Sequence, residues 1–156
     1  MSTPEQPTSQ HMSAQDITTV VRAFYEPFRT GDTSTYDRVL APDWTDIPLA
    51  PGQQQGPAGM AAQIALFRAA MPDYDVQHQD LIAAGDKVAV RNTVSGTHQG
   101  AFMGHQPTGR RIEMRTMDIH QVRAGKIVTT WHLEDFAGLM AQLTTAPEAP
   151  TPQVWA

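Results

Sequence analysis

The sequence of 156 residues predicts a domain of the α+β class, in which helices back one curved antiparallel sheet and enclose a pocket with it. Two observations carry this prediction. As far as Met71 the apolar residues recur at helical spacing, and from Tyr74 onwards the period changes towards two, which is typical of half-buried strands. Helices that precede a run of consecutive strands favour an antiparallel sheet with helices on one face.

The first half of the chain predicts three helices. The first covers residues 13–28 and should kink or end at Pro27, because proline removes a backbone donor and clashes with the preceding turn. A second, short helix is expected over residues 33–40. The third begins at Pro57, since proline suits the first helical position, and ends before Pro72.

The second half predicts four strands and a closing helix. Turn residues separate the strands: Gly85-Asp86 and Ala124-Gly125 indicate tight turns, and the glycines of residues 100–109 indicate a longer loop. Strands that follow one another in this way form an antiparallel meander. The strands cover residues 74–83, 87–98, 111–122 and 127–134, and the helix covers residues 136–143.

Composition limits the partners. The net charge of −5 comes from carboxylates spread along the chain without a run of Lys or Arg, so we expect no nucleic-acid partner. No apolar run approaches the roughly 20 residues that span a bilayer, so we expect no membrane. The absence of cysteine excludes disulfides and thiolate metal sites.

The two ends differ in composition from the rest. Residues 1–12 and 146–156 are rich in Pro, Ser, Thr and Gln, so we expect flexible tails on either side of a single domain over residues 13–145. The first residues lack the basic start and apolar stretch of a secretory signal, which makes a cytoplasmic location the expectation.

One strand carries the residues of greatest chemical interest. Alternation over 111–122 places five side chains on one face, namely Ile112, Met114, Thr116, Asp118 and His120. A carboxylate and an imidazole among apolar residues are typical of a pocket wall, where desolvation raises a carboxyl pKa. The pattern fits a solvated outer face equally well, because alternation alone does not say which face is buried.

On the next strand Trp131, Leu133 and Asp135 share a face. A hairpin that turns at Ala124-Gly125 would put Asp118 opposite Trp131, with Asp135 on the same side about 13 Å further along the ladder. The two aspartates would flank a ligand and would not share a proton.

His98 lies where a strand meets the glycine-containing loop and could donate a hydrogen bond to a ligand. Together with Asp118 and His120 it matches no established metal-ligand spacing, so we expect no metal. The glycines of residues 96–109 match no phosphate-binding motif.

Several short motifs occur in an order that resembles the SnoaL-like polyketide cyclase or ester cyclase family. The resemblance covers about residues 13–143. It rests on GDKVAVR at 85–91, GTHQG at 96–100, PTGR at 107–110, GKI at 125–127, Trp131, Asp135 and QL at 142–143.

The resemblance implies the cone-shaped fold of nuclear transport factor two and a cofactor-free enzyme, either a cyclase that closes a ring by an intramolecular aldol reaction or an isomerase, acting on a polyketide-like carbonyl compound. It implies Asp135 as the acid/base, and a homodimer. Where the cyclases carry a pocket histidine this sequence has Asp118, and Asp46 falls near a pocket asparagine, so the pocket is expected to be more acidic than theirs. The catalytic candidates are Asp135, Asp118 and His98, and the substrate-binding candidates are Asp46, Trp44, Arg91, Met114, His120 and Trp131.

Two other functions stay open. A hydrolase or hydratase of this fold would activate water with Asp118 and Asp135, and Arg91 would supply a cation. A non-catalytic domain would use the cone only for binding or dimerisation. With or without catalysis, Met117 and Ile119 lie opposite the expected pocket face and offer an apolar surface for the homodimer.

Overall fold

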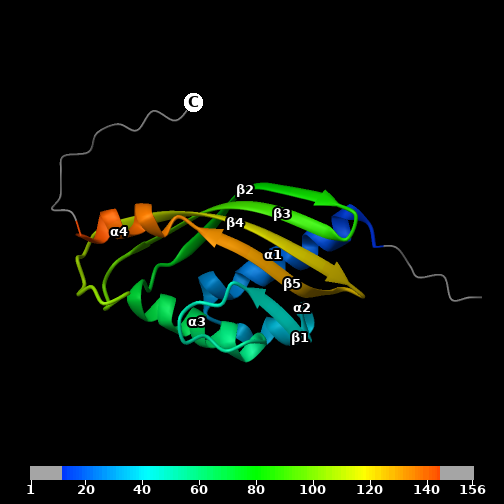
Figure 1. Ribbon diagram of the computed structural model, residues 1–156, viewed down its shortest axis with the longest axis horizontal. Helices are drawn as coiled ribbons and strands as arrows, with labels where there is room; N and C mark the ends of the chain where they lie inside the picture. The colour runs from blue at the N-terminus through cyan, green and yellow to red at the C-terminus, as the bar shows by residue number, and fades with distance from the viewer. Residues whose placement is uncertain (1–11, 145–156) are drawn as a thin grey trace, which may run out of the picture.

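The computed structural model describes residues 12–144, so both predicted tails lie almost entirely outside the described residues. It confirms the α+β class: a curved, open sheet of five strands in the order β1-β5-β4-β3-β2, with helices α1, α2 and α3 on one side of it (Figure 1). We call the side of the sheet that faces these helices the inner face.

The predicted meander is present. Strands β2 (Asp75–Ala84), β3 (Lys87–Thr97), β4 (Arg111–Arg123) and β5 (Lys126–Glu134) pair antiparallel in chain order. The turn between β4 and β5 uses positive φ at Ala124 and Gly125, as the sequence indicates for a tight hairpin.

A fifth strand, β1 (Leu40–Ile47), was not predicted and makes the sheet mixed. It pairs parallel to β5, with Ile47 beside Trp131. Two prolines look like strand breakers: Pro42 lies within β1, and Pro48 follows it directly. Proline is tolerated here because β1 is an edge strand with one unpaired side.

The helices match the expected positions with two differences. Helix α1 (Ala14–Thr30) does not end at Pro27 but continues to Thr30. The residue after it, Gly31, caps the helix in the left-handed conformation and donates its N–H to the carbonyl of Pro27. The expected second helix is a 3₁₀ turn, η1 (Thr33–Thr35), followed by the single turn α2 (Tyr36–Val39). Helices α3 (Pro57–Ala70) and α4 (Phe136–Thr144) lie where expected.

Pro27 stays inside α1, where it is buried and where the aromatic residues next to it in the sequence are packed. Phe24 contacts the rings of Tyr25 and Phe28 at centroid distances of 5.0 and 5.9 Å, and Phe28 also stacks on Tyr74. This packing offsets a cost of roughly 3 kcal/mol for a proline within a helix.

No helix in the described part of the chain is long and apolar enough to cross a membrane.

Candidate active site

A cavity of about 200 Å³ lies between the inner face of the sheet and helices α1 and α3. Its wall is mostly aromatic and apolar. Phe67 and Tyr74 stack with ring planes only 8° apart, and Phe28 lies nearly parallel to both. A wall of this kind suits a flat, conjugated ligand.

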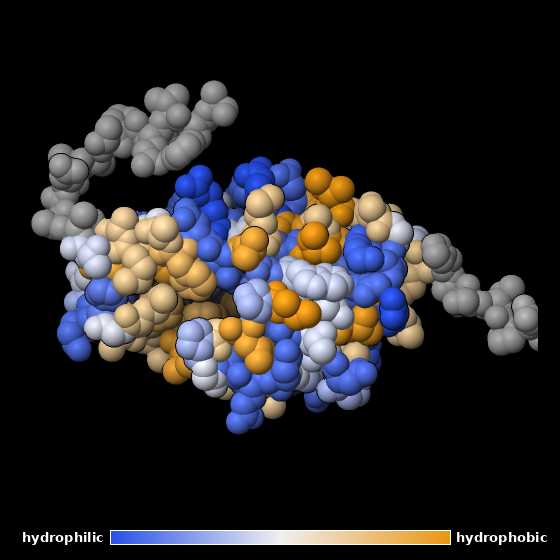
Figure 2. All heavy atoms as spheres, in the orientation of Figure 1, coloured by the Kyte–Doolittle hydropathy of each residue, from blue (hydrophilic) through white to orange (hydrophobic). Residues whose placement is uncertain are grey.

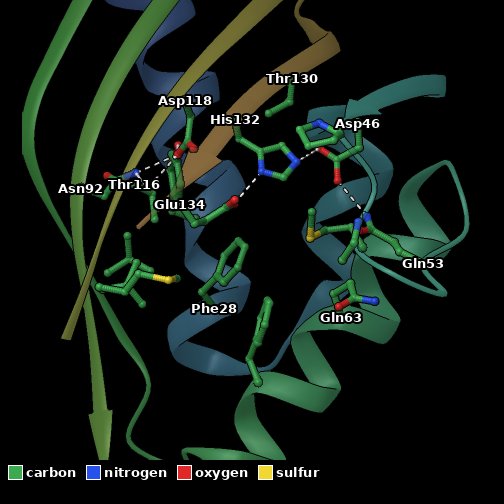
Figure 3. Close-up of a pocket in the computed structure, with 18 of the residues that line it drawn as sticks. Phe28, Asp46, Gln53, Gln63, Asn92, Thr116, Asp118, Thr130, His132 and Glu134 are labelled. Atoms are coloured by element: carbon green, nitrogen blue, oxygen red, sulfur yellow. Dashed lines mark hydrogen bonds and ion pairs between the residues drawn. The ribbon is translucent and has the colours of Figure 1, made fainter. Parts of the chain in front are cut away.

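The charged side chains of the cavity come from three neighbouring strands and gather on one side of it (Figure 3). They are Asp46 from β1, Asp118 from β4, and His132 and Glu134 from β5.

His132 bridges two carboxylates. Its Nδ1 lies 2.5 Å from Oε1 of Glu134, and its Nε2 lies 3.2 Å from Oδ1 of Asp46. Burial alone lowers the pKa of this imidazole, but the contacts with Asp46 and Glu134 outweigh burial and raise the pKa to about 10. At neutral pH His132 is therefore a cation with a proton on each nitrogen.

The two contacts of His132 differ in quality. At 3.2 Å, Nε2 and Oδ1 of Asp46 are close enough for an ion pair, yet both are buried atoms without a well-aligned hydrogen bond within residues 12–144. An unmade hydrogen bond of a buried donor costs free energy. Because both atoms are buried, a ligand oxygen reaches Nε2 and removes this cost only when the contact with Asp46 opens.

Asp118 lies directly opposite His132 in the β4–β5 ladder. Burial raises the pKa of Asp118 to about 6, against the opposing effect of the hydrogen bond from Tyr25. The described residues donate to Oδ2 alone, from Tyr25 at 2.5 Å, Asn92 at 2.9 Å and Thr116 at 3.4 Å. Oδ1 is thus left to accept a proton from a ligand.

Behind Asp118 runs a chain of buried hydrogen bonds. Trp44 donates from Nε1 to the hydroxyl of Thr130 at 3.0 Å, this hydroxyl lies 2.9 Å from Nδ1 of His120, and Nε2 of His120 lies 2.8 Å from the hydroxyl of Tyr25. Because Trp44 can only donate and the Asp118 carboxylate only accepts, every donor in the chain points towards Asp118. Burial lowers the pKa of His120 to about 3, so this imidazole is neutral, as the chain requires.

A loop closes the cavity next to Asp46. Pro48, Leu49, Ala50, Pro51 and Gln53 line the cavity from this loop. The side-chain amide of Gln55 makes two hydrogen bonds with the backbone of Asp46. Its Oε1 accepts from the N–H of Asp46 at 2.9 Å, and its Nε2 donates to the carbonyl of Asp46 at 3.0 Å. The loop and the strand that carries Asp46 are therefore held together.

The structure brings five of the predicted site residues to the cavity or directly behind it. Asp46, Met114 and Asp118 line it. Trp44 and His120 are buried behind it and act only through the hydrogen-bonded chain. The alternating face of β4 is thus the inner face, which resolves the choice that the sequence left open.

The predicted pairing of Asp118 with Trp131 is wrong. A bulge shifts the register, because Gln121 pairs with Thr129 whereas Val122 pairs with Ile127. A shift of one residue moves every later side chain to the opposite face of the sheet. Trp131 therefore lies on the outer face, opposite Ile119, and does not line the cavity.

Asp135 is also outside the cavity. Its Oδ1 accepts from the N–H of Gly138 at 2.9 Å, as a cap at the start of α4, and its Oδ2 lies 3.4 Å from the guanidinium of Arg115. The expectation that Asp118 and Asp135 share one side of the sheet is wrong for the same reason as the pairing with Trp131.

Two further predicted residues lie away from the cavity. The guanidinium of Arg91 pairs with Asp80 at 2.7 Å on the outer face. His98 is fully buried at the end of β3, where its Nδ1 lies 3.1 Å from the hydroxyl of Thr108.

Sequence reasoning missed His132 and Glu134, which the structure places in the cavity. Both residues lie on the same face of β5 as Thr130, because side chains two residues apart share a face. The sequence alone does not show that this is the inner face, since that depends on the bulge. Within residues 12–144 no group of three or more His, Asp or Glu side chains could hold a metal ion.

Fold and cavity together define the class: an α+β cone whose curved sheet and helices enclose a small-molecule pocket with buried acid and base groups. The chain belongs to the SnoaL-like polyketide cyclase family, whose model matches residues 18–143. A comparison with curated proteins gives no match.

Solved structures of similar proteins agree with this. IdmH of Streptomyces antibioticus, a proposed polyketide cyclase, is 32% identical with a TM-score of 0.73, over 83% of this chain and 99% of that one. TsrD of Streptomyces laurentii is 27% identical with a TM-score of 0.78, over 85% and 98%. AclR of Streptomyces galilaeus, a proposed hydroxylase, is 27% identical with a TM-score of 0.74, over 88% and 87%.

Proposed function

We propose that this chain catalyses an intramolecular, aldol-type ring closure of a polyketide-like carbonyl compound, without a cofactor. The observation that carries the proposal is that Asp118 and His132, a base and an acid, lie opposite each other on the wall of one aromatic cavity. The family and the likeness to IdmH support the substrate class.

Each group has a step that suits its pKa. The carboxylate of Asp118, with a pKa of about 6, takes the proton next to a carbonyl group, which leaves an enolate. The enolate carbon attacks a second carbonyl of the same molecule, and a carbon–carbon bond forms. The oxygen of that carbonyl becomes an alkoxide and takes the proton on Nε2 of His132, and solvent then restores both protonation states.

The charges of the cavity favour an uncharged substrate. His132 is the one cation among the described lining residues, and Asp46 and Glu134 already balance it. A free carboxylate on the ligand would meet the field of three acidic side chains, so an ester or ketone fits better than an acid.

The proposal is tested with a panel of anthraquinone-type polyketide methyl esters, where ring closure is followed by chromatography with mass detection. Wild-type protein should close the ring of at least one ester, and the free acid of that ester should react far more slowly. Equal rates for ester and acid would contradict the charge argument, and no closure of any ester would contradict the proposed reaction.

A water-activating hydrolase or hydratase is the second candidate, supported by Asp46 and Asp118 in the same cavity. The site that the sequence suggested for it, with Asp135 and Arg91, is not assembled. Incorporation of labelled oxygen from water into the product would favour this candidate over ring closure.

We further propose a homodimer formed through the outer face of the sheet. Exposed apolar side chains lie on this face, among them Leu133 at 73% exposed, Met117 at 65%, Ile82 and Ile119. Hydrophobic residues are gathered over the strands in Figure 2. A patch of this kind is typical of an interaction surface. Sedimentation should give a dimer that the double change Met117→Lys and Leu133→Lys converts to a monomer, and a monomeric wild type would contradict the proposal.

A further inference from the structure

The two oxygens of the Asp46 carboxylate have different partners. Oδ1 lies 3.2 Å from Nε2 of His132, whereas Oδ2 accepts a hydrogen bond of 2.8 Å from the side-chain amide of Gln53 (Figure 3). Asp46 is only 1% exposed, so water cannot replace either partner. One buried carboxylate therefore connects the loop to the acid of the proposed reaction.

The amide of Gln53 is itself fixed in direction. Its oxygen accepts from the backbone N–H of Ala50 at 3.0 Å, which leaves its NH₂ group to point at Asp46. Gln53 thus holds Asp46 from a loop whose own residues line the cavity.

The bond from Gln53 is well formed, and the contact with His132 is not. Nε2 of His132 and Oδ1 of Asp46 lack a well-aligned hydrogen bond in spite of their separation. The terminal torsion of an aspartate has a broad range of low-energy angles, so an aligned hydrogen bond can fix the direction of the carboxylate. Gln53 makes that hydrogen bond.

We propose that Gln53 is a positioning residue, which holds the Asp46 carboxylate out of line with the Nε2–H bond of His132 and so keeps Asp46 from holding this proton against the alkoxide. Without the amide, the carboxylate turns and takes the N–H of His132 into an aligned hydrogen bond. The alkoxide then has to compete with Asp46 for the proton. The catalytic consequence rests on the proposed function, but the geometric claim does not.

The test compares Gln53→Met with Gln54→Met. Methionine keeps the length of the side chain and removes the donor, and Gln54 is an exposed neighbour in the same loop. The first readout needs no substrate: in protein with ¹⁵N-labelled histidine, the Nε2–H proton of His132 is observed by NMR. In Gln53→Met it should move downfield and exchange with solvent more slowly, because it has gained an aligned acceptor.

The second readout is turnover. Gln53→Met should lower kcat by about tenfold, the worth of one hydrogen bond to a charged group, and change KM by less than about twofold. Gln54→Met should match the wild type in both readouts. Gln53→Leu, which also lacks the donor, repeats the test if the methionine variant does not fold.

An unchanged His132 signal in Gln53→Met, or the same change in Gln54→Met, would overturn the proposal whatever the activity. A changed signal with an unchanged kcat would overturn the positioning role. If no substrate is turned over by any variant, the NMR result still decides the geometric claim, and only the proposed function fails.

Discussion

Asp118 and His132 are cross-strand neighbours whose side chains enter the same cavity from β4 and β5. Burial raises the pKa of Asp118 to about 6, and two neighbouring carboxylates outweigh burial to raise the pKa of His132 to about 10. Between these values the base is deprotonated while the acid is protonated. This difference between the two pKa values makes Asp118 the base and His132 the acid in acid–base catalysis.

This separation predicts a bell-shaped pH profile. The rate constant kcat/KM should rise through pH 6 or so as Asp118 loses its proton, and fall towards pH 10 as His132 loses its own. The measurement is kcat/KM of ring closure from pH 4.5 to 10.5, over the range in which circular dichroism shows a folded protein. A rate that increases steadily above pH 10 would remove His132 as the acid.

Replacing His132 with glutamine should remove the acid and leave a group of similar size. We expect kcat to fall by roughly 10²- to 10⁴-fold, the usual contribution of a positioned acid or base. The high-pH limb of the profile should disappear as well. The matched control is His105→Gln, since His105 lies in the loop between β3 and β4 and is not among the residues that line the cavity. A similar loss in both variants would show that the effect is structural.

Asp118 should destabilise the fold at the pH where it is active. Its folded pKa of about 6 exceeds the ordinary value of 3.8, so between these values the folded state binds more protons than the unfolded state. The free energy of unfolding therefore falls as pH rises through this window, by about 3 kcal/mol for one buried group.

Asp118→Asn, which cannot ionise, should accordingly be more stable than the wild type at pH 8 and differ little from it at pH 4. Chemical denaturation of both proteins across this range measures the difference. His120 has the opposite effect, because its lowered pKa makes the fold lose stability as the pH falls below 6.5. This effect is present in both proteins and cancels when their free energies of unfolding are subtracted. A variant that is less stable at pH 8 would contradict the burial argument.

Tyr25→Phe should shift the low-pH limb of the rate profile to higher pH. The hydroxyl of Tyr25 donates to Asp118 and lowers its pKa, so its removal raises that pKa further. It also leaves Nε2 of His120 without its partner, which should cost about 1–3 kcal/mol of stability. Tyr36→Phe is the control, because Tyr36 donates to the carbonyl of Phe24 instead. An unmoved limb in Tyr25→Phe would show that Tyr25 does not act on Asp118.

Much of the fold could be predicted because local signals agree with one another. The period of two, the glycine turns and the proline at the start of α3 predict the four meander strands and the helices before them. Strand β1 was missed because it pairs in parallel with β5, which lies far from it in the sequence. No turn in the sequence therefore indicates this pairing. Its prolines also resemble breakers, although an edge strand tolerates them.

The site could be predicted only in part. The prediction was correct for the regular strand β4 and wrong for the residues that follow the bulge in β5. Asp118 and Met114 followed from alternation on a regular strand, and Asp46 from the resemblance. His132 and Glu134 were missed, and Trp131 and Asp135 were placed in the pocket, because Val128 is an extra residue that shifts the register of β5 by one. A bulge of this kind depends on how the strands curve together, and no residue in the sequence marks it.

The most direct test of the acid–base pair compares turnover of Asp118→Asn with that of Asp135→Asn under identical conditions. Asp118 lines the cavity opposite His132, whereas Asp135 caps α4 and pairs with Arg115. We predict that Asp118→Asn loses at least about a hundredfold in kcat and stays folded, and that Asp135→Asn keeps kcat within a few-fold of the wild type. Retained turnover in Asp118→Asn would contradict the role of Asp118 as the base, and loss of turnover in a folded Asp135→Asn would contradict the assignment of Asp135 to capping α4.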